Sequence, residues 1–231
     1  MLFSFWSAKG GSGTSTVSAA TALWLAEQEV GVRLADLDGD QPALLGLGSD
    51  PDSGLADWLD LGPLAPGVGL ERMAVTAPGR LTLLPRGRAR PTADGAAAAA
   101  LAVLLRSGPA PAVVDLGAAV DAVGTVTSIA DASVLVTRGC YLALRRAVRS
   151  EALASTHGVV MLEEPERALH AHDVASVLGR PVIATIPVRP GIARVLDAGV
   201  LPGRMPEELR RAARTIVGHF GSGARGRGTA A

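Results

Sequence analysis

Short hydrophobic runs recur along the chain, and most of them do not alternate with polar residues. They occupy residues 2–7, 32–35, 81–84, 112–114, 134–136, 159–162 and 182–186. Runs of this kind are typical of strands that are covered on both faces, whereas strands with one wet face alternate. The pattern therefore predicts a mainly parallel sheet.

Longer segments between these runs have apolar residues at helical spacing. Residues 14–29 contain Val17, Ala20 and Leu23 on one face and no proline, residues 94–106 are rich in alanine and leucine, and residues 206–220 are amphipathic. Strands that alternate with helices predict an α/β fold, a doubly wound sheet with helices on both faces. The 231 residues suit a single domain,. We expect it to cover residues 1–220, with 221–231 as a disordered tail.

The amino-acid composition argues against several classes of function. Aromatic residues are only 3% of the chain, which argues against an aromatic platform for single-stranded nucleic acid,. Cys140 is the single cysteine, so neither an internal disulfide nor a Cys-rich zinc site is expected, and a reducing cytoplasm fits best,. The N-terminus lacks the basic region of a signal peptide, and the apolar stretch 96–105 is too short to span a bilayer,.

The net charge is zero, but the charges are unevenly placed. Residues 27–60 carry nine acidic residues against one arginine, whereas residues 180–231 carry nine arginines against three acidic residues. The basic C-terminal region is either a solvated surface or a contact with DNA, anionic lipid or an acidic partner.

A glycine-rich loop follows the first predicted strand and precedes the first helix. Of 22 basic residues only Lys9 is a lysine, and it opens this loop, KGGSGTST. Backbone N–H groups and a helix N-terminus in this arrangement bind polyphosphate. The expected ligands of ATP are in the loop: Gly10, Gly11, Ser12, Gly13, Thr14, Ser15 and Thr16. Ser15 is expected to place its hydroxyl on Mg²⁺ and Thr16 to contact the α-phosphate.

Acidic residues end two of the predicted strands. Asp36, Asp38 and Asp40 follow the second strand, and Asp115 follows the run at 112–114. These aspartates either belong to a functional site or form an acidic turn with helix caps and a strand end.

These motifs resemble the ParA/MinD family of P-loop ATPases, which are NTPases of the SIMIBI type. The loop resembles the family's deviant Walker A motif KGGxGK[ST][ST], and the resemblance implies that Lys9 is the signature lysine that reaches the partner's phosphates in an ATP-dependent homodimer. It also implies that Asp38 orients the attacking water and the metal shell, that Asp115 holds a Mg²⁺-bound water, and that the segment ending at Pro187 backs the adenine. ATP and Mg²⁺ are the implied cofactors.

The chain departs from the family pattern at two positions. Thr14 stands where the ordinary Walker lysine is expected, so hydrolysis should be slow, because a neutral hydroxyl cannot replace a charged hydrogen bond of ~1.5–3 kcal/mol,. The family usually has an asparagine after the strand at 159–162, and Glu163 and Glu164 follow here. With a small residue at position 14, the loop resembles the loops of the CpaE/TadZ-like proteins of Flp/Tad pilus systems and of similar septum- or pole-positioning proteins.

Other reactive residues are expected to be structural or solvated. His170 and His172 lack a third metal ligand, and Cys140 has no acid or base partner in the sequence,. The loop with Arg86, Arg88 and Arg90 is either solvated or a phosphate sensor.

The sequence thus predicts a slow, ATP-dependent spatial or assembly switch. It would be cytoplasmic or recruited to the inner face of the membrane or a cell pole, with a protein partner in a secretion, pilus or positioning machine. A non-hydrolysing scaffold is the alternative. An ATP-dependent metabolic enzyme is disfavoured by Thr14, and an iron–sulfur reductase by the single cysteine.

Overall fold

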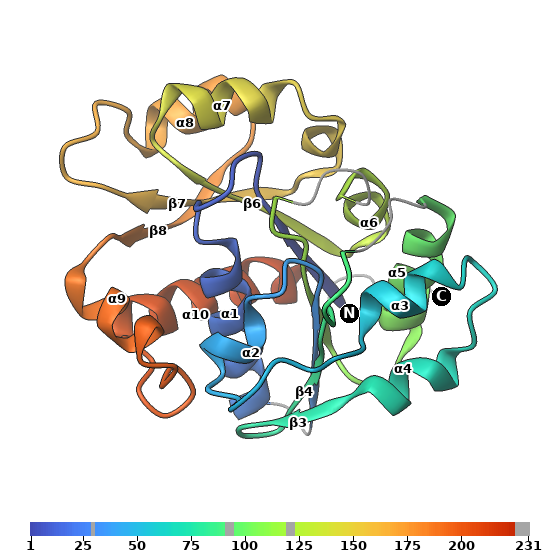
Figure 1. The fold of residues 1–231 in the computed structure, drawn as a ribbon. Coiled ribbons are helices and arrows are strands. Elements are labelled where there is room, and N and C mark those ends of the chain that lie inside the picture. Colours follow the sequence, from blue (N-terminus) through green and yellow to red (C-terminus); the bar gives the residue numbers. More distant parts are fainter. Residues whose placement is uncertain (29–30, 91–94, 119–122, 225–231) are drawn as a thin grey trace.

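One sheet forms the centre of the computed structural model, which describes residues 1–28, 31–90, 95–118 and 123–224 (Figure 1). Its strands lie in the order β3-β4-β2-β5-β1-β6-β7-β8. The parallel strands are β1 (Leu2–Trp6), β2 (Val32–Asp36), β4 (Leu81–Leu84), β5 (Ala112–Asp115), β6 (Ala132–Arg138), β7 (Gly158–Glu163) and β8 (Val182–Pro187). All seven hydrophobic runs are therefore confirmed as strands. The short antiparallel edge strand β3 (Val75–Ala77) was not predicted.

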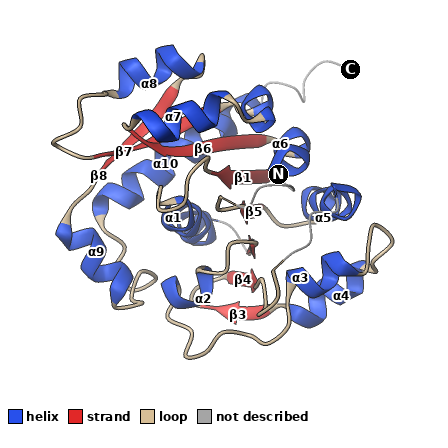
Figure 2. Ribbon diagram, turned by 45° about the horizontal axis from the view of Figure 1, so that its top comes forward, coloured by secondary structure: helices blue, strands red, loops and turns tan. Residues whose placement is uncertain are grey.

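Helices cover both faces of the sheet, as the alternation of elements predicted (Figure 2). One face packs against α1 (Thr14–Gln28), α2 (Gln41–Leu44), α9 (Pro190–Asp197) and α10 (Glu207–Ala224). The other packs against α3 (Leu55–Asp60), α4 (Gly67–Met73), α5 (Gly95–Ser107), α6 (Val123–Ile129), α7 (Tyr141–Val148), the 3-10 helix η1 (Glu151–Ser155) and α8 (Ala171–Leu178).

The central strand β1 is apolar except at Ser4. Phe3 and Phe5 point to the α1 side, while Leu2 and Trp6 point to the α5 and α6 side, and all four are fully or almost fully buried. Both faces lie under helices, which favours apolar side chains, and the buried Oγ of Ser4 has no hydrogen-bond partner within the described residues,. The structure is thus a doubly wound α/β fold.

Helix α10 packs across α1 and β8 and corrects one boundary. Leu209, Ala212 and Ile216 are buried against the core, as the amphipathic pattern predicted, and Arg210 pairs with Glu27 of α1. The helix continues to Ala224, beyond its predicted end at residue 220, and the disordered tail stays a prediction. Small residues such as Gly221 look like a tail in sequence, but the helical hydrogen bonds of the preceding turns carry the helix through them. Residues 225–231 lie outside the described residues.

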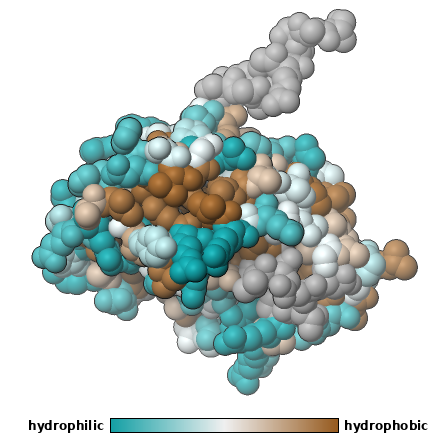
Figure 3. Space-filling view, turned by 90° about the horizontal axis from the view of Figure 1, so that it is seen from above, coloured by the Kyte–Doolittle hydropathy of each residue, from teal (hydrophilic) through white to brown (hydrophobic). Residues whose placement is uncertain are grey.

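Helices α7 and α8 pack together at one end of the molecule and carry exposed apolar side chains. Leu142 and Val148 of α7 and Val177 of α8 are each about half exposed. Viewed from this side, the surface shows hydrophobic residues next to hydrophilic ones (Figure 3). No helix of the described chain is long and apolar enough to cross a membrane.

Candidate functional site

The glycine-rich loop lies between β1 and α1 and opens a cavity. Gly11 and Gly13 have φ angles of 74° and 86°, a backbone region that glycine adopts without strain,. Ser12 Oγ donates to the carbonyl of Lys9 over 2.6 Å, and Val17 N–H donates to the carbonyl of Gly13, so the loop leads directly into the first turn of α1. Free N–H groups in the first turn of a helix favour a nearby anion.

The cavity beside the loop holds about 340 Å³, within the range of small-molecule sites,. Its polar side is formed by Ser7, loop residues 10–16, Asp38 and Asp40. Its apolar side is formed by Leu162 of β7, Ile186 and Pro187 of β8, and Ile192 and Leu196 of α9. A cavity lined by both apolar side chains and a row of backbone donors suits a ligand with a flat apolar part and a charged polyphosphate part,.

Lys9 and Thr14 occupy different environments. Thr14 is the first residue of α1, lines the cavity and is 4% exposed. Lys9 does not line this cavity. Its Nζ donates to the carbonyl of Gly10 over 3.3 Å, and the residue lines a neighbouring surface hollow together with Arg146 and Arg149. The cavity of one chain therefore receives no ammonium group from its own loop.

Three aspartates meet where β2 and β5 end. Asp36 and Asp115 are register partners in the sheet and are both fully buried. Asp36 accepts hydrogen bonds from the N–H groups of Asp38, Gly39 and Gln41, which fold the turn after β2. That turn places Asp38 on the cavity wall, where Ser15 Oγ lies 3.4 Å from its Oδ2.

The buried carboxyls hold protons unusually tightly. Burial and, after it, the nearby charge of Asp36 raise the pKa of Asp115 to about 7. Burial likewise raises the pKa of Asp36 to about 6, against the hydrogen bonds from the turn, and burial followed by the charge of Asp40 raises the pKa of Asp38. Desolvation and mutual repulsion both disfavour the charged carboxylates, so a cation would be stabilised here.

Gln41 links the loop to this acidic cluster, and sequence reasoning did not identify it. Its Nε2 donates to Asp115 Oδ2 over 2.7 Å and also to the carbonyl of Ser15 and to Ser18 Oγ. Its Oε1 is buried and accepts no hydrogen bond within the described part of the chain. The only sequence signal was a glutamine directly after the acidic turn at residues 36–40.

The residues that face the cavity fit Mg²⁺. Ser15 and Asp38 present a hydroxyl and a carboxylate side by side, which are hard oxygen ligands of the kind that Mg²⁺ prefers, and the ion usually keeps several waters and binds substrate phosphates as well,. Asp115 lies behind Gln41 and does not line the cavity, so its expected link to a Mg²⁺-bound water stays a prediction. No three His, Cys, Asp or Glu side chains in the described ranges form a metal-binding group by themselves.

The remaining candidates lie apart from the cavity. Arg86 donates to the carbonyl of Asp38 and lines a separate cavity, and Arg88 pairs with Asp52 over 2.7 Å. Cys140 precedes α7 and is half-buried, and His170 precedes α8 at the surface. Arg138 lines the cavity, although no sequence motif pointed to it.

Two curated proteins are similar to this chain in sequence. These are the uncharacterized proteins Rv3660c and MT3760 of Mycobacterium tuberculosis. Each is 30% identical to this chain over an alignment of 245 positions, gaps included, and the alignment covers 95% of this chain. The chain spans 64% of the length of these relatives. No protein-family model matches the chain.

Solved structures of ParA and MinD proteins superpose on almost the whole chain. A ParA family ATPase from Chlorobium tepidum has a TM-score of 0.74 at 24% identity and covers 92% of this chain and 95% of its own. The septum site-determining protein MinD from Pyrococcus horikoshii, solved with Mg-ADP, has a TM-score of 0.75 at 19% identity and covers 99% of both chains. MinD in the MinC:MinD cell division complex of Aquifex aeolicus has a TM-score of 0.72 at 21% identity, over 94% of this chain and 95% of that one. The chain has the fold of the ParA and MinD ATPases, a P-loop NTPase fold.

The buried carboxyls predict a characteristic pH dependence of stability. An unfolded aspartate loses its proton near pH 4, whereas Asp36 and Asp115 retain theirs until about pH 6 and 7 in the folded protein,. The folded state therefore binds more protons in this window, and these two carboxyls make the protein less stable as the pH rises through it.

The Asp115→Asn variant has no titrating group at this position. In EDTA, the free energy of unfolding of wild type relative to Asp115→Asn should fall by on the order of 2 kcal/mol between pH 5 and pH 8. Urea unfolding at each pH measures it, and a constant difference would contradict it.

Proposed function

We propose that this chain binds ATP and Mg²⁺ in the cavity beside the glycine-rich loop and uses the bound nucleotide as a slow switch. The loop with positive φ at Gly11 and Gly13, leading into the N-terminus of α1 and facing an apolar wall, carries this proposal. Backbone donors supply most of the phosphate contacts, so binding does not require the ordinary Walker lysine. Ser15 and Asp38 would hold the ion, which would neutralise phosphate charge,.

The ParA and MinD structures support the proposal that this chain is a nucleotide-dependent switch. The MinD relative was solved with Mg-ADP and is named a septum site-determining protein, and another MinD was solved with its partner MinC. We infer that this chain dimerises when ATP binds and positions or assembles a larger machine, such as a pilus, septum or chromosome apparatus. It would act in the cytoplasm, at the inner face of the membrane or at a cell pole. The exposed arginines of α10, Arg211 and Arg214, are the surface for a DNA or anionic membrane contact.

A scaffold that binds nucleotide without hydrolysing it is a second candidate. The observation that favours it is Thr14, which lines the cavity with a neutral side chain. Losing one preorganised charged donor typically lowers the rate of a chemical step about 10²–10³-fold. The switch and the scaffold both bind the nucleotide, and they differ in whether the bound nucleotide is hydrolysed.

ATP·Mg²⁺ should bind measurably by calorimetry at millimolar nucleotide, and binding should depend on Gly13. A Cβ at this position would lie 2.5 Å from Leu162 Cδ2 and in a backbone region unfavourable to alanine,. Gly13→Ala should weaken ATP binding by at least about tenfold. Gly62→Ala is the matched control, because Gly62 has nearly the same φ, 84°, with open space around it and no contact with the cavity. Absence of ATP and ADP binding to wild type would sink the proposal.

Lys9→Ala should abolish ATP-dependent dimerisation and leave the monomer folded. The Lys9 side chain is near the surface and lines no part of its own nucleotide cavity, so it contributes little to the fold and is free to reach a second chain. Light scattering with and without ATP·Mg²⁺ measures the change. Arg72→Ala on α4 removes an exposed cation elsewhere and should dimerise like wild type. An unchanged ATP-induced dimer in Lys9→Ala would refute this role.

Wild-type turnover should be well below about 1 s⁻¹, and Thr14→Lys should raise it at least about tenfold. The new ammonium would lie at the cavity wall and stabilise charge on the phosphates. Thr14→Gln, of similar length but uncharged, should not gain, and Asp38→Ala in the Thr14→Lys background should remove the gain. Single-turnover hydrolysis of the four proteins tests this. Brisk wild-type turnover would argue against the slow switch, and no gain in Thr14→Lys would favour the scaffold.

A further inference from the structure

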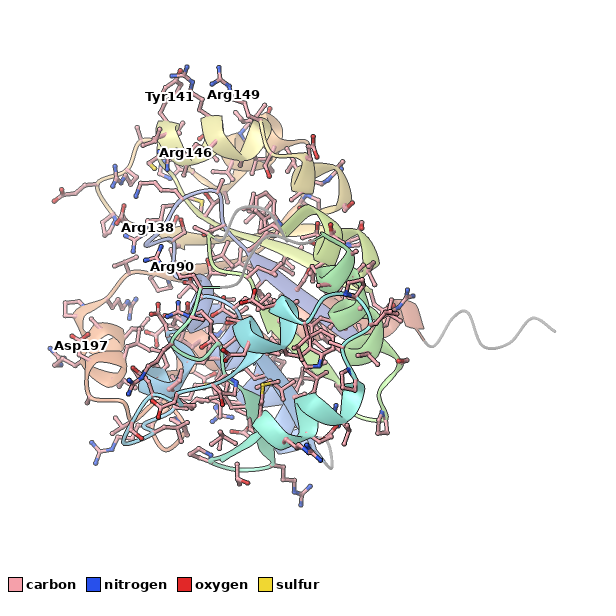
Figure 4. The ribbon with its side chains drawn as sticks, turned by 45° about the vertical axis from the view of Figure 1, so that its right-hand side comes forward. Arg90, Arg138, Tyr141, Arg146, Arg149 and Asp197 are labelled. Carbon is pink, nitrogen blue, oxygen red and sulfur yellow. The ribbon has the colours of Figure 1, made fainter. Side chains whose placement is uncertain are left out.

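Arg138 places a guanidinium group at the glycine-rich loop from outside the loop. It is the last residue of β6, its side chain is 29% exposed, and it lines the same cavity as Thr14 and Ser15. In Figure 4 it lies between α7, which carries the labelled Tyr141 and Arg146, and α9, which carries Asp197. Its Nε donates to the carbonyl of Gly11 over 2.8 Å, which fixes the guanidinium to the loop itself.

Glu164 holds this guanidinium from the other side. Arg138 Nη1 donates to Glu164 Oε1, and the other carboxylate oxygen, Oε2, accepts from Arg167 Nε over 2.5 Å. Neither bond of Arg138 uses its Nη2. The arginine is therefore oriented before any ligand arrives, and Glu164 balances part of its charge.

The other cations near the cavity are directed elsewhere. Arg189 lines the cavity beside Pro187, on its apolar side, but is mostly exposed and pairs with Glu208 over 3.1 Å. Arg86 is bonded to the carbonyl of Asp38 and faces a different cavity. Lys9 lines the neighbouring hollow. Among the described residues, Arg138 is thus the cavity-lining cation that contacts the loop.

We propose that Arg138 supplies to the bound polyphosphate the positive charge that Thr14 lacks. This inference rests on the proposed nucleotide site and adds to it the identity of the charged ligand. A guanidinium binds phosphate oxygens with two parallel hydrogen bonds, and one fixed before binding loses less side-chain entropy than a flexible one. The cation comes from the end of β6 and not from the loop, so the compensation is invisible in the loop sequence.

The test is a double-mutant cycle on the affinity for ATP·Mg²⁺. Arg138→Gln should weaken binding about 10- to 100-fold, the range for a lost charge-assisted hydrogen bond, with unchanged thermal unfolding of the nucleotide-free protein. Arg138→Lys should recover most of the loss because it keeps the charge. Arg145→Gln, which removes an exposed arginine on α7 away from the cavity, should stay within about twofold of wild type,. In a Thr14→Lys background, Arg138→Gln should cost less than about threefold, because the new lysine supplies the charge.

The outcomes separate this inference from the proposed function. Wild type that binds no nucleotide overturns both. Wild type and Arg138→Gln that bind ATP equally well overturn the role of Arg138 and leave the nucleotide site standing. An equal loss in the Thr14 and Thr14→Lys backgrounds overturns the compensation, because independent residues have additive effects.

Discussion

Parallel pairing in register along three strands is the constraint on which the site depends. Residue Phe5 of β1 pairs with Asp115 of β5, and Asp115 pairs in turn with Asp36 of β2. The strands run in the same direction, so all three end at one edge of the sheet, and the segments that follow them meet there. The backbone pairing of these strands brings together the glycine-rich loop, the acidic turn and Asp115, and the side chain of Asp36 then fixes the turn.

The cost of this arrangement is a group of carboxyls with little access to water. Asp36 and Asp115 are buried side by side, and the hydrogen bonds that they accept come from backbone N–H groups and from the amide of Gln41. These bonds stabilise the carboxylates only in part, because burial still raises the pKa of both residues,. Gln41 connects this cluster to α1 through the carbonyl of Ser15 and through Ser18. One side chain therefore joins the first turns of α1 to the end of β5 by hydrogen bonds.

The cavity would recognise its ligand through shape and backbone more than through side chains. Leu162 lies close to Gly13 and offers only an apolar contact. Thr14 likewise offers no charge. If the proposed nucleotide site is correct, selectivity for the base would come from the apolar wall formed by β8 and α9, and the charge from the end of β6. Thr14 lies on the cavity wall, whereas Glu163 and Glu164 do not line the cavity.

The sequence by itself determined the fold class, because strands buried on both faces and helices between them leave a pattern that is readable over many residues. It also indicated the glycine-rich loop and the aspartates, since glycines at positive φ and acidic residues at strand ends are local signals. It missed β3, whose three residues carry too short a pattern, and it ended α10 too early, because helical hydrogen bonds extend through small residues. Only the tertiary structure showed that Lys9 faces away from its own cavity, that Asp115 lies behind Gln41, and that Arg138 contacts the carbonyl of Gly11. These contacts join residues up to 127 positions apart in the chain, and the packing of strands and helices, not local spacing, brings them together.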